Sequence, residues 1–269
     1  MRLTTFGEIQ AAREHVDRAD VLELAKDSPA LRSALQMYRP ENWWGSGVAA
    51  GELLRIAHEE GIPLAWVPRV EIVTALAQAP DAGQRLQLLE ARQHDVVEDC
   101  RSEVENATDE WLEDVQPLAL KALDAYEDGH TEAAMALAVS VAEPLALWAS
   151  VPRVQSFESE AEADEWEKQR ARGLGYGLAA AELAKKRKIE LGFLRQILIA
   201  PIPRFFTRWF PSDGTPPPDG LSRHVVAHQA EIGHFTRSNS LLALMLVSSL
   251  LREQQDWSEE VRHMDHAGD

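Results

Sequence analysis

Apolar residues recur at helical spacing along nearly the whole chain, and this periodicity constrains the fold more than any other feature of the sequence. Glycine and proline breaks such as Gly61-Ile62-Pro63, Pro80 and Gly129 fall between the periodic segments, as expected at helix ends. We find no segment with the alternation of a half-buried strand. The pattern predicts an all-α helical bundle, with helices over residues 9–25, 47–60, 71–79, 84–107, 109–126, 130–149 and 238–254.

Proline residues are expected to interrupt several of these helices, because proline lacks a backbone N–H donor and its ring clashes with the preceding turn. Pro117 should kink or break the segment 109–126, and Pro144 should bend the segment 130–149. The clearest loop of the chain is the Pro/Gly-rich stretch 211–220. Residues from 258 onward are polar and are expected to fray.

The charge of the chain is unevenly distributed. Its net charge is −17, which argues against a protein that coats nucleic acid non-specifically. Residues 51–150 hold 20 acidic and 6 basic side chains, which gives −14, whereas residues 151–250 hold 11 and 13, which gives +2. The split suggests two functional regions. A solvated face is the simpler interpretation of the acidic run 98–132, and masking of the basic region by that run is a second hypothesis.

The sequence gives no targeting signal that we recognise, so a cytoplasmic protein is the default expectation. We expect no signal peptide at the N-terminus, and the apolar stretches 197–202 and 241–251 are shorter than the roughly 20 residues that span a bilayer. No membrane association is therefore expected. The single cysteine, Cys100, excludes an intramolecular disulfide framework and is predicted to be a buried thiol on the inner side of a helix.

The greatest concentration of reactive side chains is the segment Leu221-Ser-Arg-His-Val-Val-Ala-His228. Arg223 supplies a fixed cation, and His224 and His228 titrate near neutral pH, which is the minimum equipment for proton transfer at a phosphate. On an α-helix, His224 and His228 share a face, whereas Arg223 and His228 lie about 140° apart. A local Arg223–His228 pair is therefore not expected. The alternative interpretation is that Arg223 is a surface residue that caps a carboxylate and that His224 and His228 are ordinary histidines of a helix.

Arg223, His224 and His228, followed by a polar turn and the apolar run from Asn239, resemble the signature of the HEPN superfamily of all-helical domains. That signature is an arginine, four to six residues, and a histidine, with a polar residue after the arginine. Gln229 stands where many members have glycine. The resemblance covers residues 113–257. It divides the chain into an N-terminal helical region of unknown role (1–112), a HEPN-like helical domain (113–257) and a polar tail (258–269).

The resemblance implies a metal-independent endoribonuclease, in a bacterial defence or toxin–antitoxin setting, with RNA as substrate. It also implies a homodimer in which two motifs face each other, and an antitoxin or regulatory protein as a further partner. His228 would be the general acid or base, Arg223 would bind the phosphate, and His224 would orient His228 or contact RNA. A HEPN-like helical module that binds or regulates without catalysis is the alternative.

Basic and aromatic residues near the motif are secondary candidates for RNA binding. The basic candidates are Lys185, Lys186, Arg187, Lys188, Arg204, Arg208 and Arg237, and the aromatic candidates for base stacking are Phe205, Phe206, Trp209 and Phe210. A solvated helix end is an equally good interpretation of the Lys/Arg cluster, and core packing is favoured for the aromatic residues. Arg195 is a further basic residue that could extend this patch towards the motif.

A metal site and a partner-binding surface are weaker possibilities. His224 and His228, with His234 and Glu231 nearby, are possible ligands, but the sequence lacks the His-Glu-x-x-His pattern of zinc proteases. We therefore expect no metal and no cofactor. Trp43-Trp44 and the stretch 62–69 are predicted to anchor a loop between helices rather than to form a recognition surface.

Overall fold

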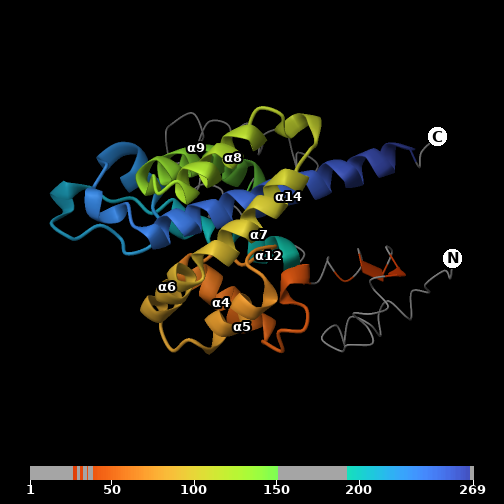
Figure 1. Ribbon diagram of the computed structural model, residues 1–269, viewed down its shortest axis with the longest axis horizontal. Helices are drawn as coiled ribbons and strands as arrows, with labels where there is room; N and C mark the ends of the chain where they lie inside the picture. Colours follow the sequence, from red (N-terminus) through yellow and green to blue (C-terminus); the bar gives the residue numbers. More distant parts are fainter. Residues whose placement is uncertain (1–26, 29–30, 33–34, 36–38, 151–192, 267–269) are drawn as a thin grey trace, which may run out of the picture.

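The computed structural model describes residues 27, 28, 31, 32, 35, 39–150 and 193–266 (Figure 1). Within these residues the protein contains nine α-helices and no strand, which confirms the all-α prediction. The predicted helix 9–25 and the whole segment 151–192, with the cluster Lys185–Lys188, lie outside the described residues. The α-helices are α4 (Ala50–Glu60), α5 (Val70–Gln78), α6 (Ala82–Ala91), α7 (Gln93–Asn106), α8 (Gln116–Glu127), α9 (Thr131–Ser150), α12 (Phe193–Ile199), α13 (Ile202–Phe205) and α14 (Arg237–His266).

The last helix, α14, is the axis of the bundle. It packs against α6, α7, α8 and α9, and Figure 1 shows it running the length of the molecule. Residues 241–251 of α14 are buried on all sides, as a helix that is apolar around its whole circumference must be. Two buried serines of this helix donate to carbonyl oxygens: Ser240 Oγ to Thr131 O and Ser248 Oγ to Leu244 O.

The buried side chains form one continuous hydrophobic cluster from Trp43 to Leu251. Helix α7, before the predicted boundary at 112/113, packs against both α8 and α14 after it. The core therefore continues across that boundary, and the division into two regions stays a prediction from sequence. Helix α14 also continues to His266, past the predicted end near residue 254 and into the segment 258–269.

Helix boundaries follow the proline and glycine signals in most places. Gly61 ends α4 in the left-handed conformation, with φ 74°, as glycine allows. Pro117 lies in the first turn of α8, so the segment 109–126 is broken rather than kinked. The single helix predicted over 84–107 is wrong, because the chain breaks at Arg92 between α6 and α7. The capping residue of α14 is Thr236, whose Oγ1 accepts from Asn239 N, rather than Ser238 or Asn239.

The aromatic loop before α5 is an anchor, as predicted. Trp43 is fully buried and donates through Nε1 to Leu64 O at 2.7 Å, and Asn42 donates to the carbonyl oxygens of Leu64 and Pro68. Trp66 is buried beneath the guanidinium of Arg252 on α14. These contacts fix the loop against α14, so Trp43 and Trp66 are not available as a recognition surface.

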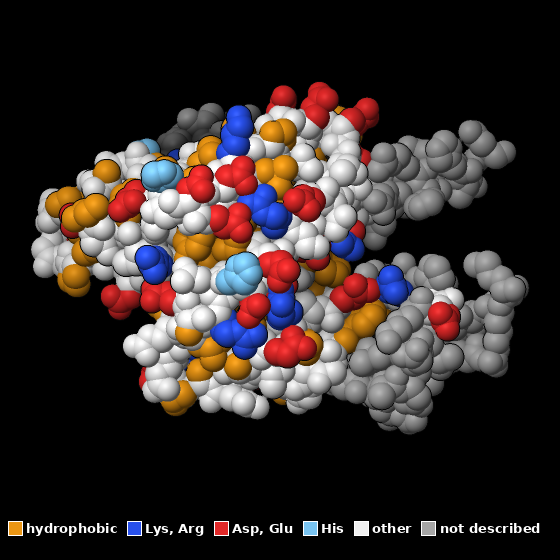
Figure 2. All heavy atoms as spheres, in the orientation of Figure 1, with side chains coloured by type: hydrophobic (Ala, Val, Ile, Leu, Met, Phe, Trp, Pro, Cys, Tyr) orange, Lys and Arg blue, Asp and Glu red, His pale blue; other side chains and the backbone are white. Residues whose placement is uncertain are grey.

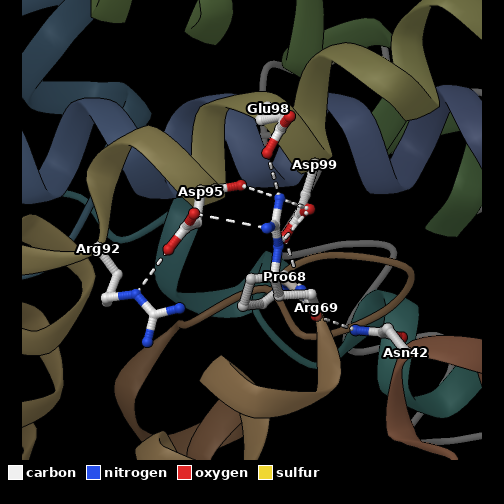
Figure 3. A network of polar contacts seen from close by, with 7 residues as sticks. All are labelled: Asn42, Pro68, Arg69, Arg92, Asp95, Glu98 and Asp99. Carbon is white, nitrogen blue, oxygen red and sulfur yellow. Dashed lines mark hydrogen bonds and ion pairs between the residues drawn. The ribbon is translucent and has the colours of Figure 1, made fainter.

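Arg69 fastens the beginning of α5 to α7 (Figure 3). Its guanidinium points toward Asp95, Glu98 and Asp99, and its Nη2 lies 2.6 Å from Asp99 Oδ1. Its backbone N–H also donates to Asp99 Oδ2 at 2.7 Å. The acidic side chains of α7 are thus partly engaged in ion pairs within the bundle. On the face drawn in Figure 2, acidic and basic side chains are interspersed.

Helix α9 is long and apolar enough to cross a membrane by length and composition, with a mean hydropathy of 1.3 over Thr131–Ala149. Half of that window is buried inside the bundle, where α9 packs against α8 and α14. A core helix passes the same test, so the absence of membrane association stays a prediction. Pro144 lies inside α9 without ending it.

Candidate active site

The motif lies on a turn whose hydrogen bonding is not α-helical. Val225–Gln229 form a π-helical turn, closed by a hydrogen bond of 2.8 Å from Ala230 N to Val225 O, five residues earlier. Such turns occur mostly as single insertions and are frequent at functional sites. Ala230 ends the turn at φ 44° and ψ 46°, a left-handed conformation that an alanine adopts at a cost of about 1–2 kcal/mol.

The π turn brings Arg223 and His228 together. Arg223 Nη1 lies 3.0 Å from His228 Nε2. A turn closed between residues five apart contains more residues than an α-helical turn, so the side chain five positions on returns to the same face. The expectation that these two residues point about 140° apart and cannot pair locally is therefore wrong, because it assumed α-helical geometry.

Arginine can only donate hydrogen bonds, so in this contact Arg223 Nη1 is the donor and His228 Nε2 is the acceptor. The His228 side chain is exposed, whereas Arg223 is half-buried. The pair thus presents an imidazole at the surface next to a fixed cation.

Glu143, on α9, is the third member of this cluster. Its Oε1 lies 2.5 Å from Arg223 Nη2, and the two side chains are 27% and 24% exposed. The carboxylate pairs with Nη2 of the guanidinium, whereas the imidazole contacts Nη1. Arg223 Nε is buried and has no hydrogen-bond partner.

His224 lies beside His228 but in a more enclosed environment. The two rings meet edge-on, with centroids 5.1 Å apart, and His224 also meets Phe210 edge-on at 4.6 Å. Burial lowers the pKa of His224, and the nearby His228, Arg223 and Arg208 lower it further. Its Nδ1 is buried without a hydrogen-bond partner. Its surroundings therefore favour the neutral form of the His224 imidazole.

A buried polar network holds the chain just before the π turn. Ser222 is fully buried; its hydroxyl donates to Thr207 O at 2.7 Å, and its backbone N–H donates to His234 Nε2 at 3.1 Å. Burial lowers the pKa of His234, which matches its role as an acceptor. Asn239 Nδ2 in turn donates to His234 O at 2.9 Å.

This network also bears on the metal alternative. His234 directs its Nε2 to a backbone N–H rather than toward His224 and His228. Within residues 39–150 and 193–266, no group of three or more His, Cys, Asp or Glu side chains is placed to hold a metal ion. The expectation of a metal-free site remains a prediction.

The structure places Arg208 beside the motif and the other described basic candidates, Arg204 and Arg237, at two cavities. Arg208 is exposed and close enough to His224 for its charge to lower that pKa. Arg204 instead lines a cavity of about 360 Å³ with Glu59 and Glu60. Arg237 lines a second cavity, of about 440 Å³, at the start of α14. Lys185, Lys186, Arg187 and Lys188 lie outside the described residues, as does the side chain of Arg195.

Of the four aromatic candidates, three are core residues and one is exposed beside the motif. Phe205 and Trp209 are buried and Phe206 is half-buried, so core packing is confirmed for these three. Phe210 is 43% exposed and contacts the motif through His224.

No protein-family model, curated protein or solved structure matches the chain. The resemblance to HEPN domains therefore rests on the motif and its helical setting.

The sequence did not identify Glu143 as part of the site. It is 80 residues from Arg223 and lies in an alanine-rich helix with no motif around it. One available signal was its position beside Pro144, since a charged residue in an otherwise apolar helix centre calls for a partner.

Proposed function

We propose that the protein is a metal-independent endoribonuclease whose reacting groups are Arg223 and His228. The observation that supports this most is the contact of 3.0 Å between Arg223 Nη1 and His228 Nε2 at an exposed position. An exposed imidazole next to a cation is suited to deprotonating a hydroxyl beside a phosphate.

The reaction begins when an RNA phosphate reaches the site. A phosphate oxygen replaces His228 Nε2 as the acceptor of Arg223 Nη1, which releases the imidazole lone pair. His228 then removes the proton of the ribose 2′-OH, and the 2′-oxygen attacks the adjacent phosphorus. The P–O5′ bond breaks, protonated His228 returns that proton to the leaving 5′-oxygen, and a 2′,3′-cyclic phosphate remains.

The other two residues have supporting roles in this scheme. Glu143 positions Arg223 through the pair at 2.5 Å, and is a positioning residue rather than a catalytic one. His224 is the second imidazole at the site, and it orients His228 or contacts RNA. DNA lacks the 2′-OH, so it is not a substrate.

The biological setting and partners follow from the HEPN resemblance. We propose a bacterial defence or toxin–antitoxin role in the cytoplasm, a homodimer, and control by an antitoxin or regulatory protein. A dimer is not needed to bring Arg223 and His228 together, because the two residues meet within one chain. A dimer would therefore carry one complete Arg223–His228 pair in each chain.

The test is cleavage of single-stranded RNA by the purified full-length chain in EDTA. We expect products with 2′,3′-cyclic phosphate ends, and loss of cleavage in Arg223→Ala and His228→Ala. Matched controls are Arg55→Ala, which removes an ion-paired surface arginine, and His58→Ala, which removes an exposed histidine of α4. Both controls should cleave as the wild-type chain does.

A non-catalytic helical module is the second candidate, and one observation favours it. Arg223 already has two partners within the chain, Glu143 and His228, so the cluster also serves to tie the π turn to α9. RNA left intact by the wild-type chain, together with loss of stability in Arg223→Ala, would support the module and reject the nuclease.

A further inference from the structure

Phe210 is an exposed aromatic ring on a backbone that is held in place. It follows Trp209 in extended conformation, with φ −131° and ψ 143°, so the two side chains point in opposite directions. Trp209 is buried and donates through Nε1 to Thr215 O at 2.9 Å, whereas Phe210 is 43% exposed. The backbone N–H of Phe210 donates to Asp213 Oδ2 at 2.9 Å.

This arrangement leaves the ring oriented before any ligand arrives. The Trp209 anchor and the Asp213 bond fix the backbone on both sides of the Phe210 side chain. A fixed aromatic face loses little conformational entropy when a planar group stacks on it. Phe210 is thus a preformed platform.

The position of the platform indicates what it meets. Phe210 touches His224 edge-on at 4.6 Å, and His224 touches His228, the proposed base, at 5.1 Å. The guanidinium of Arg208, two residues before Phe210, also acts on His224 through its charge. Cations suited to phosphates and an aromatic face suited to a base therefore lie together, as in sites for single-stranded nucleic acid.

We propose that Phe210 is a base-stacking subsite that selects unpaired RNA. The inference rests on the proposed function and names its substrate class. With the scissile phosphate at Arg223 and His228, a neighbouring nucleotide places its base on the Phe210 ring. A base in a duplex has both faces stacked, so only a single-stranded or extruded nucleotide fits.

Binding to a fluorescent single-stranded oligonucleotide tests the subsite without cleavage. The probe carries 2′-O-methyl groups throughout, which removes the attacking hydroxyl, and its duplex is the comparison. Loss of one stacked base weakens binding by about five- to 100-fold, so Phe210→Ala should raise the Kd for the single strand by that factor. The Kd for the duplex should not change.

Two variants serve as controls. Phe210→Trp keeps a stacking surface and should bind the single strand at least as well as the wild-type chain. Trp111→Ala removes an aromatic side chain that is 78% exposed and lies outside the candidate site, and should leave binding unchanged.

The result that overturns the subsite is a Phe210→Ala Kd within about twofold of wild type, or no binding of the single strand by the wild-type chain. A change in hydrodynamic mass in Phe210→Ala, with unchanged RNA binding, would assign the ring to a protein contact instead.

Cleavage of an all-ribose strand separates the stacking subsite from the proposed nuclease function. Cleavage with an unchanged Phe210→Ala KM rejects the subsite alone, whereas a binding loss without any wild-type cleavage rejects the nuclease alone.

Discussion

Breaking the ion pair between Glu143 and Arg223 should cost a measurable amount of stability. The pair joins α9 to the residue that leads into the π turn, with Glu143 Oε1 2.5 Å from Arg223 Nη2. Exposed ion pairs contribute about 0.2–1 kcal/mol, and hydrogen bonds to buried charges contribute about 1.5–3 kcal/mol. Because both side chains are about one-quarter exposed, we expect a coupling energy of about 1–1.5 kcal/mol.

A double-mutant cycle isolates this energy. The free energy of unfolding in urea is measured for the wild-type chain, Glu143→Ala, Arg223→Ala and the double variant, at low and high salt. The partial burial of the pair predicts a coupling that weakens only slightly with salt. A coupling below about 0.3 kcal/mol, or one abolished by salt, would refute the role of Glu143 in holding Arg223.

Three further predictions concern single residues. His234→Gln keeps an acceptor for Ser222 N but removes the titratable imidazole. Since the His234 pKa is lowered in the fold, the unfolded chain binds more protons below pH 6.5. In urea titrations, the wild type should therefore lose stability as pH falls from 6.5, and the variant should lose less. Ala230→Gly relieves a left-handed alanine and should raise the free energy of unfolding by up to about 1 kcal/mol; a decrease would contradict the π-turn geometry. Cys100 is fully buried and its pKa is raised to about 12, so thiol reagents at pH 8 should label it only in denaturant, and rapid labelling of the folded chain would contradict its burial.

The bundle could be predicted from sequence because local signals agreed with tertiary packing. The apolar run 241–251 had to be buried on all sides, and α14 buries it in the centre of the bundle. Gly61 and Pro117 marked a helix end and a helix start through their backbone chemistry. The break at Arg92 carried no such signal, because neither glycine nor proline stands there and the apolar spacing continues through it.

The sequence identified some residues of the candidate site but not their geometry. Arg223, His224 and His228 were identified by residue type and spacing, but their geometry depends on a π turn that the sequence does not announce. The end of that turn could not be predicted, because the left-handed position 230 is an alanine rather than a glycine. Glu143 joins the site only through the packing of α9, and Phe210 is distinguished from its buried neighbours only by the direction in which it points.

The central claim is that Arg223 and His228 act together within a single chain on RNA. Complementation tests it most directly: Arg223→Ala and His228→Ala chains are unfolded together, refolded as a mixture, and assayed for RNA cleavage in EDTA beside wild-type chain treated in the same way. No mixed assembly then contains a chain with both residues. We predict that the refolded wild-type chain cleaves and that the mixture stays inactive. Restored cleavage in the mixture would show that the arginine and the histidine come from different chains, and would contradict the pairing at 3.0 Å as the reacting arrangement.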